Sequence, residues 1–164
     1  MIPERTAEDE AQKAAMERAG RLLAARPRTE SELRRRLSAA GLETGVVDDA
    51  LGRLTQLGLV DDGAFARQWV EERSRKPGKS SRALRAELRS KGVDGDVVEE
   101  AVEACRDGDE RRAEEAAARW VRRVSGLPVA AQAQKIVAML VRRGFDTEVA
   151  RSATRAVLPP EGWE

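Results

Sequence analysis

The chain has 164 residues, of which 36% are charged and 3% are aromatic, and its formal net charge is +1. This composition favours helices and predicts no membrane span, because no uncharged apolar run approaches 18 residues and the N-terminus lacks a signal-peptide pattern. The single cysteine, Cys105, excludes an intramolecular disulfide, and the absence of histidine removes the usual zinc-ligand and nucleophile–base sets. We therefore expect a cytoplasmic protein that is not an enzyme.

The charges are unevenly distributed along the chain. Residues 1–60 hold ten acids and ten bases, whereas residues 61–92 carry a net charge of +4. Residues 93–118 carry −7, and residues 119–164 return to +4. Two basic blocks that flank an acidic one indicate a partner with patterned charge or exposed phosphates, and an ordinary solvated helical surface explains the pattern equally well.

In chain order, the first element is an N-terminal tail over residues 1–13, followed by a helix over residues 14–26. Pro27 ends this helix, and Thr29 with Glu32 fits a capping box at the start of the next one. A repeat then begins, because residues 32–54, 83–105 and 135–157 align without a gap.

Each copy of the repeat has apolar residues at its second and sixth positions and a glycine at its tenth. The apolar stripe predicts a helix, and the glycine supplies the left-handed backbone conformation that ends it. The short turn that follows predicts an antiparallel helical hairpin. The residues at these positions are Leu33, Leu37 and Gly41, then Leu84, Leu88 and Gly92, and finally Ile136, Leu140 and Gly144.

A further helix precedes each hairpin, over residues 61–75 and 109–124 in the later copies. Trp69 and Trp120 lie on the apolar faces of these helices, which favours a place in the core over base stacking. Ser80 or Ser81 is expected to cap the second hairpin, and Cys105 falls in an apolar register that predicts burial.

The sequence thus predicts an all-α fold of three tandem three-helix repeat modules in an elongated array, straight or curved. The expected boundaries are 14–60, 61–107 and 108–158, with a C-terminal tail at 159–164.

Two short motifs could indicate a metal or a phosphate site. The pair Asp61 and Asp62 directly precedes a helix, so we interpret it as capping rather than as metal ligation. The run from Gly78 to Ser80 has the end of a phosphate-binding loop, but the first glycine of that loop would fall at Arg73 and no strand precedes it. Neither motif predicts catalysis.

Basic side chains form the candidate surface for a partner or for DNA. Arg82, Arg85 and Arg89 recur at helical spacing and share one helix face, which predicts a continuous basic stripe, with a solvated face as the alternative. In order of preference the candidates are Arg73, Arg75, Lys76, Lys79, Arg82, Arg85, Arg89 and Lys91, then Arg34, Arg35 and Arg36, and then Arg142 and Arg143.

The chain resembles the RecX family of recombination regulators over residues 14–157. The most specific parts are the run from Gly58 to Asp62 and the run from Leu84 to Gly92, whereas the third module is the loosest match. The resemblance implies a cytoplasmic negative regulator of homologous recombination that needs no cofactor. It also implies binding to the RecA recombinase filament, inhibition of its ATPase and strand exchange, and limited filament growth on single-stranded DNA.

The residues leave open a second function, that of a non-sequence-specific DNA-binding helical protein. Sequence-specific readout needs a recognition helix rich in polar and basic residues, and only residues 149–157, with Arg151, Ser152 and Arg155, approach that composition. The expected partners are the RecA filament and, through phosphates, single- and double-stranded DNA, with no membrane. We expect a monomer.

Overall fold

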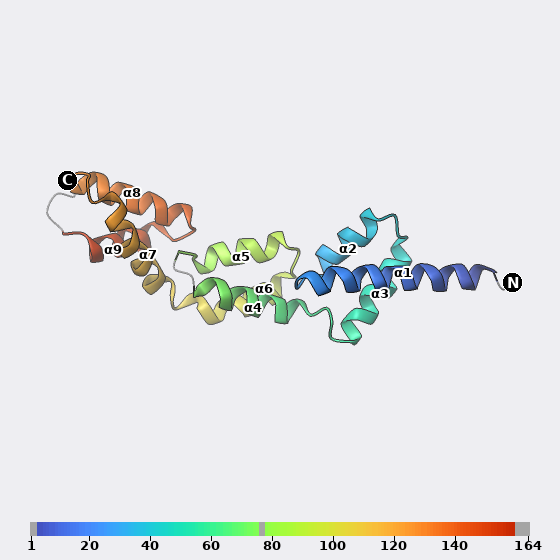
Figure 1. Ribbon diagram of the computed structural model, residues 1–164. Helices are drawn as coiled ribbons and strands as arrows, with labels where there is room; N and C mark the ends of the chain where they lie inside the picture. Colours follow the sequence, from blue (N-terminus) through green and yellow to red (C-terminus); the bar gives the residue numbers. More distant parts are fainter. Residues whose placement is uncertain (1–2, 76–77, 160–164) are drawn as a thin grey trace. The chain divides into compact units, whose positions relative to one another are not determined.

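The computed structural model describes residues 3–75 and 78–159, which form helices joined by turns, with no strand among them (Figure 1). The prediction of an all-helical fold is confirmed, whereas the three-module division and its boundaries stay a prediction. No helix in these ranges is long and apolar enough to span a membrane. The helices are α1 (Pro3–Ala25), α2 (Glu30–Ala39), α3 (Thr44–Gln56), α4 (Asp62–Ser74), α5 (Ser81–Ser90), α6 (Gly95–Arg106), α7 (Asp109–Val124), α8 (Val129–Arg142) and α9 (Thr147–Val157).

The first helix begins at Pro3, so residues 3–13, which were expected as a tail, are helical and continuous with the helix predicted over residues 14–26. Proline suits the first position of a helix because its missing N–H would have no partner there, and the following residues are rich in the helix formers Ala, Glu, Gln and Lys. Residues 6–10 are exposed, and burial in α1 is complete only at Ala15 and Ala19. Apolar periodicity missed this extension because intrinsic propensity, rather than an apolar face, supports it.

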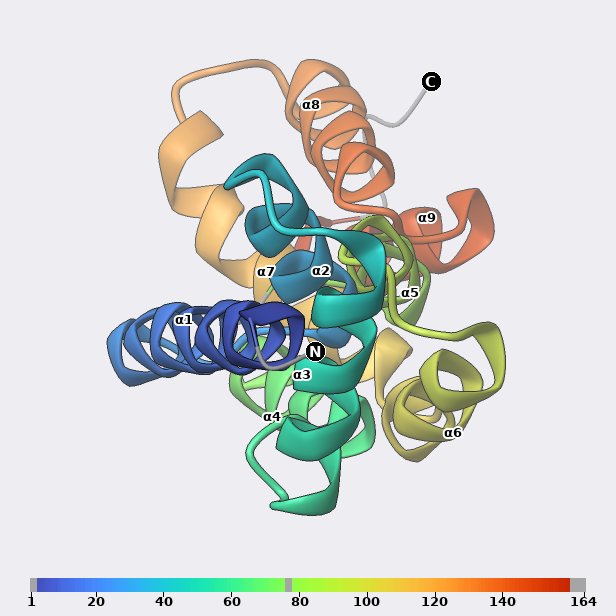
Figure 2. The ribbon, with the colours of Figure 1, turned by 90° about the vertical axis from the view of Figure 1, so that its right-hand side faces the viewer.

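The chain divides into two compact units. One takes in the residues up to Ala66 together with Arg89–Val97, and the other takes in Arg67–Leu88 together with the residues from Val98 onward. In the first unit α1, α2 and α3 pack on one another, and in the second α7, α8 and α9 do so. Helices α8 and α9 lie side by side in both ribbon views (Figures 1 and 2). The repeat positions predicted to be apolar are fully buried: Leu33, Leu37, Leu84, Leu88, Ile136 and Leu140.

The three repeat glycines end α2, α5 and α8, as predicted. Gly41, Gly92 and Gly144 have φ values of 84°, 77° and 90°, a region that suits glycine because other residues are strained there. After α2 the Gly41 N–H donates to the carbonyl of Ser38 (3.0 Å) and the Leu42 N–H to that of Leu37 (3.4 Å). These bonds satisfy helix-end carbonyls that would otherwise lack a partner.

The helix starts are capped by side chains in the same regular way. Thr29 and Glu32 form the predicted capping box, and Ser80 Oγ accepts the N–H of Ala83 (3.0 Å) at the start of α5. Asp61 Oδ1 accepts the N–H of Ala64 (2.9 Å), which confirms its predicted role as a cap. Each side chain satisfies one of the free N–H groups in a first helical turn.

Each N-cap hydroxyl also reaches the end of another hairpin helix. Within the first unit Thr29 Oγ1 donates to the carbonyl of Lys91 (2.7 Å), and within the second Ser80 Oγ donates to that of Arg143 (3.4 Å). The glycine after each carbonyl lies against the capped helix, since a Cβ on Gly92 would overlap Ser31 and one on Gly144 would lie 2.6 Å from Ser80 Oγ. The repeat therefore encodes a helix-end junction that occurs once in each unit.

Aspartates at the first position of α4 and α7 complete these junctions. Asp62 Oδ1 accepts the N–H of Glu30 (2.9 Å), the first residue of α2, and Asp109 Oδ1 accepts the N–H of Ser81 (2.8 Å), the first residue of α5. A carboxylate at a helix N-terminus also complements the helix dipole. The acidic residue at the start of one helix thus caps a different helix.

The two glycine environments predict different costs for substitution by alanine. Gly41 has open space around it, so Gly41→Ala should cost only the strain of a positive φ, about 1–2 kcal/mol. Gly92→Ala adds the overlap with Ser31 and should cost at least about 1 kcal/mol more than Gly41→Ala. Urea unfolding followed by circular dichroism measures both changes within the same unit. Equal costs for the two variants would contradict the close approach at Gly92.

Candidate interaction groove

A groove of about 610 Å³ lies in the second unit, between the start of α5 and the turn that joins α8 to α9. Its cations outnumber its acids, because four basic side chains line it against Glu87 and Asp146. These four come from two of the basic sets singled out in the sequence: Lys79, Arg82, Arg142 and Arg143. The groove therefore unites candidates that are separated by about sixty residues along the chain.

The helix-end junction brings these basic residues together. The hydrogen bond from Ser80 to the carbonyl of Arg143 holds the start of α5 against the end of α8. Gly78 lets the guanidinium of Arg143 approach the backbone, since a Cβ at this glycine would overlap it, and its φ of 114° also suits glycine. Asp146 caps α9 by accepting the N–H of Glu148 (3.0 Å), and its carboxylate offsets the positive end of that helix dipole.

Two of the four cations remain available to a partner. Within the described ranges Arg82 and Arg142 are exposed and pair with no acid. Lys79 Nζ contacts Glu87, yet burial, followed by the positive charges of Arg73 and Arg143, lowers the pKa of Lys79. Because four cations line the groove against two acids, the local potential is positive and the groove suits carboxylates or phosphates.

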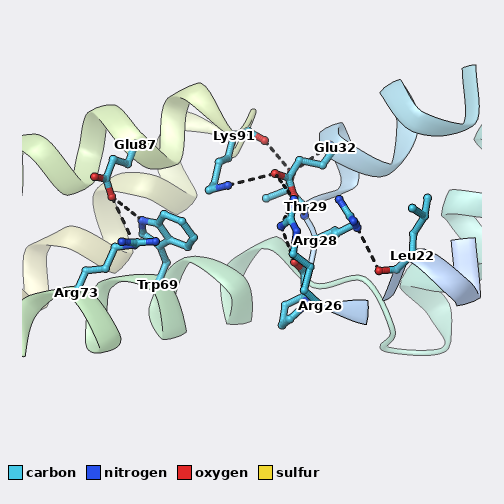
Figure 3. Close-up of polar contacts among 10 residues, drawn as sticks. Leu22, Arg26, Arg28, Thr29, Glu32, Trp69, Arg73, Glu87 and Lys91 are labelled. Atoms are coloured by element: carbon cyan, nitrogen blue, oxygen red, sulfur yellow. Dashed lines mark hydrogen bonds and ion pairs between the residues drawn. The ribbon is translucent and has the colours of Figure 1, made fainter. Parts of the chain in front are cut away.

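Glu87 contacts Trp69, Arg73 and Lys79, the first two of which are drawn in Figure 3, and its pairing with Arg73 removes one predicted candidate from the open surface. Its Oε2 accepts from Trp69 Nε1 (2.9 Å) and pairs with Arg73 Nε (3.6 Å), while Lys79 contacts Oε1. Arg73 also lies over the Trp69 ring, 3.7 Å from its centroid. Arg73 thus ties α4 to α5, and Trp69 is half-buried with a polar partner rather than a fully enclosed core residue.

The predicted basic stripe on α5 is interrupted at its centre. Arg85 donates to both carboxylate oxygens of Glu99 (2.8 and 2.9 Å), and this pairing raises the pKa of Arg85. Arg82 and Arg89 on either side are exposed, so the continuous stripe expected from helical spacing is not formed. Arg75 is exposed and pairs with Glu71, and Lys76 lies outside the described residues.

In the first unit, Lys91 belongs to an ionic cluster around the buried Glu32 (Figure 3). Glu32 accepts from Lys91 Nζ (3.2 Å), from the Arg26 guanidinium (3.4 Å) and from the Thr29 N–H (3.4 Å). Burial alone would raise the pKa of Glu32, but the hydrogen bonds from Lys91 and Arg26 outweigh it and lower that pKa. Lys91 Nζ also lies 5.9 Å from the centroid of the Phe65 ring, so the charge of Lys91 takes part in contacts within the unit.

In the second candidate set, on α2, one arginine is paired with acids and the other two are exposed. Arg34 pairs with Glu30 (3.1 Å) and contacts Asp48, and these two partners raise its pKa. Arg35 and Arg36 are exposed. Among the described residues no group of three or more His, Cys, Asp or Glu side chains is placed to hold a metal, and Cys105 is buried as predicted.

Comparison with known proteins places these features in one family. Residues 15–54 match the model for the first three-helix domain of RecX, and residues 61–102 match the model for its second three-helix domain. The regulatory protein RecX of Mycobacterium ulcerans (strain Agy99) is 45% identical over 143 residues, which cover 86% of this chain and 83% of the relative. The chain belongs to the RecX family.

Other members agree in sequence and in fold. The regulatory protein RecX of Mycobacterium avium (strain 104) is 42% identical over 86% of this chain and 83% of the relative. The crystal structure of RecX from Lactobacillus salivarius has a TM-score of 0.80 at 19% identity, covering 91% of this chain and 97% of that one. A second crystal structure, of a regulatory protein RecX, has a TM-score of 0.81 at 25% identity, covering 90% and 74%. The two mycobacterial relatives and the second crystal structure are named regulatory proteins.

The Glu32 cluster predicts a specific pH dependence of stability. A carboxyl whose pKa is lower in the folded state stabilises the fold above its ordinary pKa of 4.5, and this contribution is lost as the pH falls through the lower folded value. Glu32→Gln should therefore cost about 1–3 kcal/mol at pH 7, and the difference from the wild type should shrink below pH 4.5.

Urea unfolding at pH 7, 5 and 3 measures this difference. Burial raises the pKa of Asp62 and so acts in the opposite direction; this main cause is common to both proteins, whereas the smaller effect of the Glu32 charge on Asp62 is lost in the variant. Glu30→Gln is the matched control, because its pair with Arg34 is more exposed and should contribute little. A cost for Glu32→Gln that stays constant with pH would contradict the role of Glu32.

Proposed function

We propose that this chain is a negative regulator of homologous recombination that binds the RecA filament and inhibits its ATPase and strand exchange by limiting filament growth. Membership of the RecX family supports this proposal. The observation that carries it is the basic groove, which presents Arg82 and Arg142 beside the N-terminus of α9 without an acidic partner among the described residues. A regulator that acts by binding needs such an open charged surface.

The groove can engage either component of a nucleoprotein filament. A guanidinium presents a planar fork of donors that matches a carboxylate of a protein or a phosphate of DNA in a bidentate geometry. Arg82 projects from the first turn of α5 and Arg142 from the last turn of α8, so the two forks approach the groove from different helices. A ligand that contacts both is positioned across the junction rather than along one helix.

Binding to DNA phosphates alone is the second candidate function, because the same groove has more cations than acids. The two functions differ in their dependence on salt. Affinity for DNA that rests on phosphate contacts falls steeply as the salt concentration rises, in proportion to the number of contacts. Contacts with a protein filament that combine charge with apolar burial should weaken less.

Titration of the single-stranded-DNA-dependent ATPase of the cognate RecA tests the proposed function. Inhibition should be strong well below one copy of this chain per RecA monomer, because limiting filament growth needs few molecules. Absence of inhibition, together with salt-sensitive binding to bare DNA, would contradict filament regulation and favour the DNA-binding alternative.

Charge reversal in the groove should weaken inhibition without changing the fold. The double variant Arg82→Glu and Arg142→Glu should raise the concentration needed for half-inhibition by about tenfold or more, since each loses an ionic contact and introduces repulsion. Arg119→Glu, an exposed position on α7 that does not line the groove, is the matched control. Circular dichroism should show the same helicity in the double variant and in the Arg119→Glu control. Full inhibition by the double variant would remove the groove from the mechanism.

A further inference from the structure

A second groove, of about 620 Å³, lies on the outer side of the α8–α9 hairpin in the second unit. Its apolar floor comes from α8, where small and aliphatic side chains recur at helical spacing. It contains no acidic residue, and three arginines complete its lining. The groove residues are Ala130, Ala133, Gln134, Val137, Ala138, Val141, Arg142, Arg151 and Arg155.

Part of this floor lies outside the core: Ala133 belongs to the buried core and Val137 packs against it, whereas the neighbouring apolar side chains are open to solvent. Ile136 and Leu140 are fully buried against α7 and α9. Val141 instead is 42% exposed, and Ala138 beside it is also exposed. The outward face of a surface helix normally carries polar or charged residues, so an apolar strip here suggests a contact surface.

The arginines of this groove favour a ligand that carries negative charge. Arg142 and Arg151 are exposed and have no acidic partner in the part of the chain that the structure describes, and Arg155 lies one turn beyond Arg151 on α9. A phosphate backbone would pair with Arg142 and Arg151 but would gain nothing from the apolar floor. A segment with carboxylates along one edge and aliphatic side chains on one face would complement both features.

We propose that this groove binds an amphipathic helix of a protein partner, with acidic residues along the edge that faces Arg151 and Arg155. The apolar strip from Ala130 to Val141 is about three helical turns long, so the bound segment is of similar length, about 11 residues. Ala130 and Ala138 let the backbone of the bound segment approach closely, and the larger apolar side chains of that segment, at spacings of three and four residues, fill the groove. This inference goes beyond the proposed ATPase inhibition and does not require it.

The probe for this proposal is a fluorescein-labelled designed helix of about 15 residues, with leucines on one face and glutamates along both edges. Fluorescence anisotropy with the full chain measures its affinity. A second peptide with lysine in place of every glutamate should bind about tenfold more weakly or worse, because it meets the three arginines with like charge.

Variants of the chain locate the binding. Val141→Ser should lower the affinity for the acidic peptide by about tenfold, and so should the double variant Arg151→Glu and Arg155→Glu. Lys135→Glu, an exposed position on α8 outside the groove, should leave its affinity unchanged. Val141 is exposed, so its substitution keeps the core intact, which circular dichroism verifies.

Three results would overturn the proposal. Equal affinity for the acidic and basic peptides, or no binding of either, would remove the charge complementarity on which it rests. Displacement of the acidic peptide by an oligo-dT strand would assign the groove to phosphates, if the strand no longer binds the Arg151 and Arg155 double variant. Self-association in sedimentation velocity that Val141→Ser abolishes would make a second copy of this chain the occupant.

Discussion

The hydrogen bond between a capping hydroxyl and the carbonyl that directly follows another hairpin helix is the constraint on which the arrangement within each unit depends. Thr29 and Ser80 each accept an N–H of their own helix and donate to the carbonyl of Lys91 or Arg143. One hydroxyl thus satisfies polar groups of two helices, which would be costly to leave unpaired once buried. The glycine that follows the carbonyl is required because a side chain there would overlap the capped helix.

The same junction determines which charges remain open. It brings the start of α5 to the end of α8, and so places Arg82 near Arg142 in one groove. Nearby carboxylates occupy several other cations, since Glu87 binds Arg73 and Glu99 binds Arg85. Counts of basic residues along the chain therefore overstate the charge available to a partner, because a cation in a bidentate pair offers little attraction to a second anion.

The two grooves of the second unit have different chemistry although they adjoin. Both are lined by Val141 and Arg142, but one continues over charged residues and the other over small apolar ones. The first suits an anionic surface or phosphates, and the second suits a folded peptide segment. A binding protein with two such neighbouring surfaces can hold a large assembly at more than one point, and linked contacts of this kind strengthen one another.

The sequence by itself determined the helical class, the repeat, the glycine helix ends and the caps at Thr29, Ser80 and Asp61, because these depend on local backbone conformation and on spacing within one or two turns. It also indicated the basic residues, but not which of them are open. Only the tertiary structure decided that Arg85 is paired, that Asp62 caps a helix 32 residues earlier, and that Lys79 and Arg82 meet Arg142 and Arg143. These outcomes depend on which helix ends meet in space, and no local pattern of side chains carries that information.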